Sequence, residues 1–319
     1  MFTNLGRRIL ETPQTEIWSV MLGVARTVLA LATGLTLLFT NPQTLLQSNS
    51  SLIDRSLCQG IDAANMFCLV RIEKIPLMYG LALMVLALVA SGWRPRLTGV
   101  LHWWVAWSYH QAGTFVDGGD QAAMILTLLL IPVTLTDPRV WHWQRAATVE
   151  HDLERPVARL VALGWLSMIR LQVAVIYFHA AVAKFAVPEW INGTAVYYWF
   201  DSAILGMPDW LHPILDPVLT SAVPVLAITW GTMLLEIMLA LGLLAETRYR
   251  RPMLVLGLMF HAGIALIFSL SSFMLAMDAA LLLYLGDPGW KLSLPKLGKR
   301  LPKPIQIIFI NQDDRVTTL

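Results

Sequence analysis

Eight stretches of mostly apolar residues, separated by shorter polar segments, make up most of the chain. A helix needs about 20 apolar residues to cross a hydrocarbon core of roughly 30 Å, and slightly shorter or longer stretches can also span it. The pattern therefore predicts an all-α fold, a polytopic transmembrane helix bundle. Its eight expected spans are residues 17–40, 76–93, 99–116, 121–136, 160–187, 221–245, 253–270 and 273–285.

These spans define one membrane domain, residues 17–285, with a polar lead at 1–16 and a basic tail at 286–319. The two longest polar interruptions are residues 41–75 and 188–220, which we expect to be loops outside the membrane. The second loop is acidic. No internal repeat is visible, and we expect no soluble second domain.

The composition agrees with an integral membrane protein, because 56% of the residues are hydrophobic and only 14% are charged. Soluble domains are about one quarter charged. Most of the 23 Lys and Arg residues fall on one side if the chain crosses eight times, and the other side holds only Arg55, Arg71 and Lys74. The positive-inside rule then places both termini in the cytoplasm, and we expect a bacterial inner membrane. The scattered basic residues form no nucleic-acid recognition motif, so we expect no nucleic-acid partner.

Ionisable residues also occur inside the expected spans, where an unpaired charge costs on the order of 3 kcal/mol. Glu236 and Asp278 are expected at about the same depth as Arg26 and Arg170, which predicts an interhelical charge network. That network could fix the helix register, relay protons or ions, or bind an anionic headgroup or substrate. The six residues are Arg26, Arg170, Lys184, Glu236, His261 and Asp278.

The fifth span carries His179 and Lys184 before it breaks at Pro188. Lys184 could extend its amine to the outer interface, or it could be a partly desolvated base. His179 lies about 140° round the helix from Lys184 and could be a satisfied core histidine or a second site residue. Helical spacing places Lys184 on one face with Tyr177, Ala180 and Ala181.

The third span and the turn after it supply further candidate catalytic groups. His110 and Asp117 are seven residues apart and share a helical face, and Asp120 follows a double glycine. Near the outer end, these groups could converge with Lys184. Histidine and carboxylate side chains can bind metals. Here, however, they are dispersed without a compact motif, so we predict no metal site.

Cys58 and Cys68 are ten residues apart in the first outside segment. An oxidising compartment favours a structural disulfide between them, and the alternative is two small buried thiols. Their spacing is not that of a CxxC redox centre.

The stretch VIYFHAAVAKFAVPEWINGTAVYY resembles the signature of the HTTM superfamily, whose multispan fold is shared with vitamin K-dependent gamma-carboxylase. Arg26, Glu236 and His261 also resemble intramembrane charges of that superfamily. The two-cysteine loop and the compact length look most like its sporulation-delaying protein B (SdpB) branch, which is associated with maturation of a secreted antimicrobial peptide. The signature elements are Tyr177, Phe178, Ala180, Ala181, Lys184, Trp190 and Gly193.

The resemblance implies two functions, and the buried charges leave a third open. In the first, the protein assists maturation or export of a small secreted peptide, together with a separate partner protein. In the second, it is a membrane enzyme that uses Lys184 as base with a lipid-soluble, quinone-type cofactor. Two departures from the carboxylase weaken the second function. Gly119-Asp120 stands where the carboxylase has a histidine, and we expect no counterpart here of the large lumenal domain that follows the spans of the carboxylase. The third is a proton or ion pathway.

Overall fold

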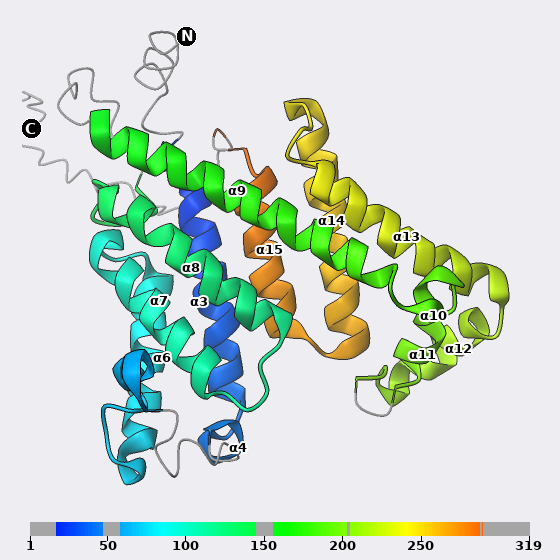
Figure 1. The fold of residues 1–319 in the computed structure, drawn as a ribbon, viewed down its shortest axis with the longest axis horizontal. Coiled ribbons are helices and arrows are strands. Elements are labelled where there is room, and N and C mark those ends of the chain that lie inside the picture. The colour runs from blue at the N-terminus through cyan, green and yellow to red at the C-terminus, as the bar shows by residue number, and fades with distance from the viewer. Residues whose placement is uncertain (1–16, 47–57, 145–155, 203–204, 288, 290–319) are drawn as a thin grey trace, which may run out of the picture.

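A computed structural model of the chain describes residues 17–46, 58–144, 156–202, 205–287 and 289, and every named element in these ranges is a helix (Figure 1). The predicted all-α class is therefore confirmed. The lead, most of the tail and part of the first outside loop lie outside the described residues.

The long helices correspond to the apolar stretches of the sequence. Five of them are long and apolar enough to cross a membrane: α3, α8, α9, α13 and α14. Two more, α6 and α15, are shorter apolar helices, so the bundle is confirmed while the number of crossings stays a prediction. The long helices are α3 (Val20–Phe39), α6 (Ile75–Ser91), α7 (Pro95–Ala112), α8 (Gly118–Thr136), α9 (Pro156–Lys184), α13 (Ala222–Leu241), α14 (Thr247–Phe268) and α15 (Ser271–Leu285).

The short elements all lie in the two expected outside loops. Cys58 and Cys68 form a disulfide in the first loop, which confirms the predicted pairing. These elements are α4 (Pro42–Leu46), η1 (Gly60–Ala64), η2 (Ile72–Lys74), α10 (Pro188–Ile191), α11 (Ala195–Phe200), η3 (Asp209–Leu211) and α12 (His212–Leu219).

Local chemistry sets several helix ends differently from the apolar pattern. The third helix begins at Pro95, four residues before the expected start, because a proline suits the first helical turn and needs no N–H partner there. The preceding helix ends at Ser91, because the next residue, Gly92, has a φ of 88° that is readily available only to glycine. At α8, the Asp117 side chain accepts hydrogen bonds from the N–H groups of Gly119 and Asp120, so the helix begins there.

Helix α3 lies at the centre of the bundle, where it packs against α15, α6 and α8. By contrast, α13 packs mainly along α9, and α14 packs mainly along α15. Figure 1 shows α13 running away from α14, with α10, α11 and α12 gathered near the start of α13. The divergence of these two consecutive helices leaves room for a cavity between them.

The described parts of the basic loops that the sequence predicts on one side lie at one end of the bundle. Here Trp18 Nε1 donates a hydrogen bond to the carbonyl of Val133 (3.3 Å), which joins the chain before α3 to the end of α8. Tyr284 Oη donates to the carbonyl of Leu239 (3.0 Å), which joins the ends of α15 and α13. We call this the arginine end, and it holds Arg94, Arg96, Arg139 and Arg250. That it faces the cytoplasm stays a prediction.

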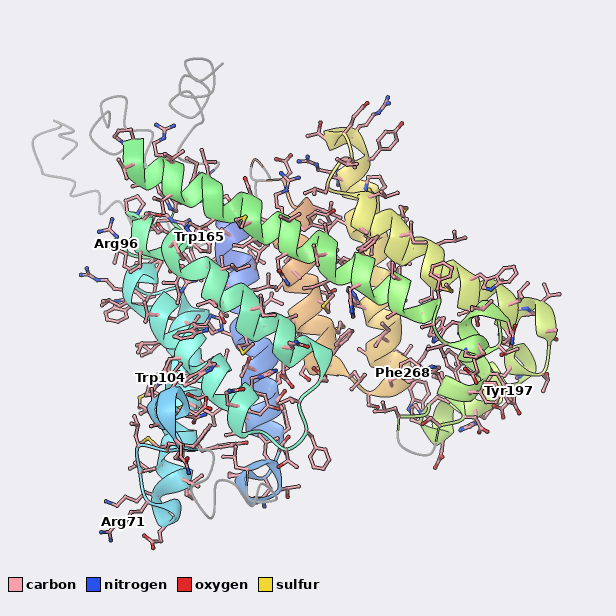
Figure 2. The ribbon with its side chains drawn as sticks, viewed as in Figure 1. Arg71, Arg96, Trp104, Trp165, Tyr197 and Phe268 are labelled. Atoms are coloured by element: carbon pink, nitrogen blue, oxygen red, sulfur yellow. A yellow bond between two sulfur atoms is a disulfide. The ribbon has the colours of Figure 1, made fainter. Side chains whose placement is uncertain are left out.

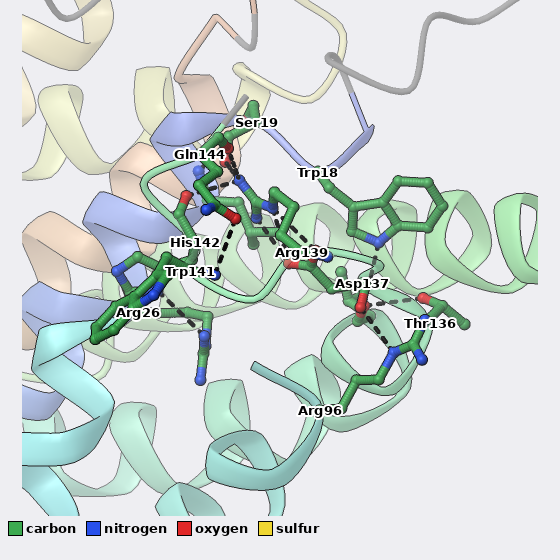
Figure 3. Close-up of polar contacts among 12 residues, drawn as sticks. Trp18, Ser19, Arg26, Arg96, Thr136, Asp137, Arg139, Trp141, His142 and Gln144 are labelled. Carbon is green, nitrogen blue, oxygen red and sulfur yellow. Dashed lines mark hydrogen bonds and ion pairs between the residues drawn. The ribbon is translucent and has the colours of Figure 1, made fainter. Parts of the chain in front are cut away.

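A buried polar cluster closes the arginine end (Figure 3). Arg139 pairs with Asp137 at 2.7 Å and also donates hydrogen bonds to the carbonyls of Ser19 and His142. Arg26 donates to the Nδ1 of His142 at 3.2 Å and to Thr98. The loop after α8 is therefore tied to α3 by charge-assisted hydrogen bonds, which are the stronger kind.

His142 lies in this loop and is fully buried. Burial, with smaller contributions from the charges of Arg26 and Arg139, lowers the pKa of His142 to about 3. The neutral ring can accept the hydrogen bond that Arg26 donates. It can also donate from Nε2 to Thr27 Oγ1, 3.3 Å away, whose own hydroxyl donates to the carbonyl of Ala90.

This depressed pKa predicts that the protein loses stability as the pH falls from about 7 toward 4. Below about 6.5 the unfolded chain protonates His142 while the folded chain does not, so acid favours unfolding. The melting temperature in detergent should therefore fall less between pH 7.5 and 5 in His142→Gln than in the wild type. A His142→Gln profile parallel to that of the wild type would contradict the assignment.

Candidate functional site

A cavity of about 700 Å³ lies between α9, α11, α13 and α14, in the half of the bundle away from the arginine end. Phe268, labelled in Figure 2, lines this cavity, and its ring meets the ring of Phe200 edge to face. The cavity is of the size and apolar character that small-molecule and apolar-chain sites have. Its aromatic lining residues are Trp190, Trp199, Phe200, Phe260, Phe268 and Phe273.

Lys184 and Glu236 are the charged residues of the cavity wall. Lys184 Nζ lies 2.7 Å from Glu236 Oε1, and the exposed fractions of the two side chains are 19% and 7%. The same amine donates to the carbonyl of Ala180 at 3.2 Å and lies 4.9 Å from the centre of the Trp190 ring. Lys184 thus turns inward to an acidic partner, which favours the interior interpretation over extension to the interface.

The pair leaves one hydrogen-bonding position open. Glu236 Oε2 is buried and, among the described residues, has no hydrogen-bond partner. A buried carboxylate oxygen without a partner is costly, so it is an acceptor ready for a donor that enters the cavity. Lys184 already directs its donors at Glu236, Ala180 and Trp190.

A second polar group lies behind the cavity wall. His261 is buried, with its Nε2 3.3 Å from Tyr177 Oη and its Nδ1 3.3 Å from Asp278 Oδ1. The latter two atoms are close but not aligned for a hydrogen bond. The Phe273 ring, which lines the cavity, meets His261 edge to face.

The four charges expected to form one network make separate contacts instead. Arg26 lies at the arginine end, Glu236 pairs with Lys184, and Asp278 lies beside His261. Arg170 has Nε and Nη2 buried without hydrogen-bond partners in the described part of the chain. Depth along a helix can be read from the sequence, whereas the face that a residue presents to a neighbouring helix depends on packing.

The candidates near the start of α8 serve its helix cap. Asp117 Oδ1 accepts from Gly119 N at 2.8 Å, and Asp120 Oδ2 accepts from Asp117 N at 3.2 Å. The Tyr109 hydroxyl, 3.4 Å away, also donates to Asp120. No contact seen in the described ranges joins His110, Asp117 or Asp120 to Lys184, so the expected convergence is not observed.

Three further observations complete the site. His179 is exposed on the outer face of α9, so of the expected candidates from this helix only Lys184 lines the cavity. At Gly119 an added Cβ would lie 2.7 Å from the Phe273 Cα, so glycine lets α8 approach α15 beside the cavity wall. The aromatic wall from α11 was not anticipated, although the run AVYYWF after Gly193 gave a signal for it.

Comparison with known proteins shows the family of the chain. The HTTM domain family matches residues 18–290 of the chain. The chain belongs to the HTTM family. That domain covers all eight long helices, so the cavity and its ion pair lie within it. The predicted membership of the HTTM superfamily is thereby confirmed.

Two relatives come from Bacillus subtilis (strain 168). The uncharacterized protein YitO is 36% identical over 287 residues, which are 89% of this chain and 91% of YitO. Sporulation-delaying protein SdpB is 33% identical over 270 residues, which are 84% of this chain and 81% of SdpB. No solved structure matches.

The ion pair predicts strong coupling between Lys184 and Glu236. Lys184→Met or Glu236→Leu alone should destabilise the protein, because each leaves a largely buried charge without its partner. The double variant should recover much of that loss. The coupling free energy should be about 1–3 kcal/mol in a double-mutant cycle of unfolding in mixed micelles. His179→Gln, on the exposed face of the same helix, is the matched control and should change little. Additive single-variant effects would show that the two side chains do not interact.

Proposed function

We propose that this integral membrane protein of the HTTM family assists maturation or export of a small secreted, antimicrobial-type peptide. In this proposal the cavity holds an apolar segment of the peptide beside Lys184 and Glu236. A separate protein partner supplies whatever chemistry the maturation needs. The single observation that carries the proposal is an apolar cavity whose open polar position is an acceptor, Glu236 Oε2.

The lining suits a peptide segment because it is largely apolar and aromatic. Trp199, Ile228 and Met259 line the cavity and are also exposed, so the cavity opens onto the surface of the bundle. An apolar segment could then enter from the hydrocarbon region without crossing the polar arginine end. With the arginine end in the cytoplasm, the cavity would lie in the outer half of the membrane, where a secreted peptide emerges.

The open acceptor suits a peptide backbone. An extended peptide in an apolar environment carries N–H groups that must find acceptors, since each unsatisfied group costs several kcal/mol. Glu236 Oε2 offers such an acceptor on the cavity wall, and the Lys184 ammonium neutralises the charge of the same carboxylate. The similarity to SdpB is a second, independent support.

Deletion and complementation in the native cell test the proposal. Mass spectrometry of culture supernatants should show a mature secreted peptide in the wild type that is lost, or replaced by its precursor, in the deletion strain. The wild-type gene should restore the peptide. The double variant Lys184→Met with Glu236→Leu, present at wild-type level in the membrane, should not restore it.

The matched control is Phe178→Leu, because Phe178 lies on the same helix with 61% of its surface exposed, outside the cavity lining. It should restore the peptide fully. An unchanged set of secreted peptides in the deletion strain would refute the proposal. Full complementation by the double variant would refute the role of the ion pair.

A second candidate is a membrane enzyme that uses Lys184 as base with a lipid-soluble, quinone-type cofactor. The observation that favours it is the group of Tyr177, Glu236 and His261 close to an apolar cavity. Against it, Lys184 is engaged in an ion pair, and a quinone carbonyl needs a donor where the open position is an acceptor. Lys184→Arg separates the two candidates, since arginine keeps the ion pair but cannot serve as a base. If the Lys184→Arg strain still produces the mature peptide, the result favours a protein that holds the peptide. If the mature peptide is lost while the level of the protein is unchanged, the result favours catalysis by Lys184.

A further inference from the structure

A second cavity, of about 200 Å³, lies at the arginine end, between the start of α7 and the loop after α8. It is separate from the cavity beside Lys184, which lies in the other half of the bundle. Figure 3 shows Arg96 and Arg139 on either side of Asp137. The lining residues are Arg94, Arg96, Leu97, Pro138, Arg139 and Val140.

The charges around this cavity do not balance. Asp137 neutralises Arg139 through contacts of both carboxylate oxygens. Arg96 donates from Nε to the backbone carbonyl of Asp137 at 2.8 Å, so this contact does not remove its charge. Within the described ranges no ion pair involves Arg94 or Arg96, and both are exposed. Counted over the described residues alone, the site therefore has two positive charges in excess, which would be met by an anion.

Arg94 is held in place by its backbone. Its φ is 39° and its ψ is 70°, in the left-handed region that residues other than glycine rarely occupy. Its N–H donates to the carbonyl of Val140 at 2.7 Å, and its carbonyl accepts from Leu97 and Thr98. Such a conformation costs on the order of 1 kcal/mol or more and persists where neighbouring contacts enforce it. The fold thus fixes an arginine at a position where glycine would be less strained.

An apolar surface runs from the same place along α7. Leu97, Val100 and Leu101 are exposed and, at i, i+3 and i+4, share one face of the helix. Trp93 and Trp141, paired across an isolated bridge, are exposed beside the arginines. Exposed tryptophans are typical of the level of lipid headgroups. We therefore expect the guanidinium groups of Arg94 and Arg96 at the level of the lipid headgroups, with the exposed apolar face of α7 beginning beside them.

We propose that this second cavity, at the arginine end, binds the phosphate group of an anionic phospholipid. The guanidinium groups of Arg94 and Arg96 contact the phosphate, and one acyl chain lies along Leu97 and Leu101. Guanidinium groups match phosphate oxygens geometrically, and basic pockets at this level select anionic headgroups by charge. This site does not depend on the peptide function proposed above.

Lipid titration of the purified full-length protein tests the site. The protein, in zwitterionic detergent, is titrated with phosphatidylglycerol or phosphatidylcholine, and binding is followed by native mass spectrometry and melting temperature. The wild type should bind phosphatidylglycerol preferentially and be stabilised by it. Arg94→Gln with Arg96→Gln should weaken this binding about tenfold, as expected for lost charge-assisted hydrogen bonds.

Two further variants separate loss of the site from general loss of charge and from misfolding. Arg248→Gln with Arg251→Gln removes the same charge from the start of α14, at the same end of the bundle, and should leave the preference unchanged. Arg94→Gly relieves the left-handed strain, so it should fold at least as stably as the wild type while still weakening phosphatidylglycerol binding.

Three results would overturn the proposal. The first is an unchanged lipid preference in Arg94→Gly and in the double glutamine variant. The second is an equal loss of preference in the Arg248 and Arg251 control, which would indicate general charge attraction. The third is full stabilisation of the wild type by inorganic phosphate alone with no further effect of phosphatidylglycerol, which would indicate a free-anion site.

Discussion

The pairing of charges within an apolar bundle is the constraint on which the rest of this structure depends. A buried ion in hydrocarbon costs several kcal/mol unless a partner or hydrogen bonds compensate for it. Lys184 and Glu236 meet this requirement across α9 and α13, the two helices that form one side of the larger cavity. The contact both neutralises two charges and fixes the position of α13, which packs mainly on α9 and diverges from α14. Without this pair, the cavity would lose the charged part of its wall.

The two ends of the bundle use charge differently. At the arginine end, Arg26, Arg139 and Asp137 are buried, and their hydrogen bonds are largely satisfied by His142, Thr98 and backbone carbonyls. That arrangement stabilises a loop. In the other half, Glu236 Oε2, His261 Nδ1 and Asp278 Oδ1 are buried without hydrogen-bond partners among the described residues. Buried groups of this kind beside an apolar cavity suit a binding site, and Arg170 and His102 carry further such atoms away from the cavity lining.

The sequence predicted the helices well, because apolar length and capping chemistry are local properties. The eight expected stretches each correspond to one long helix, and the disulfide between Cys58 and Cys68 is present. The pairing of charges was not predictable in the same way. The pattern predicts that Arg26 meets Glu236 and Asp278, yet its side chain points toward His142, since the partner depends on how the helices pack. The sequence pattern marks Asp117 and Asp120 as candidate catalytic residues, and in the structure both side chains cap the start of α8. The cavity itself comes from the divergence of α13 and α14, which no local pattern encodes.

The central claim is that the cavity beside Lys184 and Glu236 holds an apolar segment of a secreted peptide. Site-specific photo-crosslinking in the native cell tests it most directly, with a benzoylphenylalanine placed at Phe260 in the cavity wall or at Phe178 on the exposed face of α9. We predict a covalent adduct with a small secreted peptide or its precursor at Phe260 and none at Phe178. Adducts of equal yield at both positions, or lipid adducts alone at Phe260, would contradict the account.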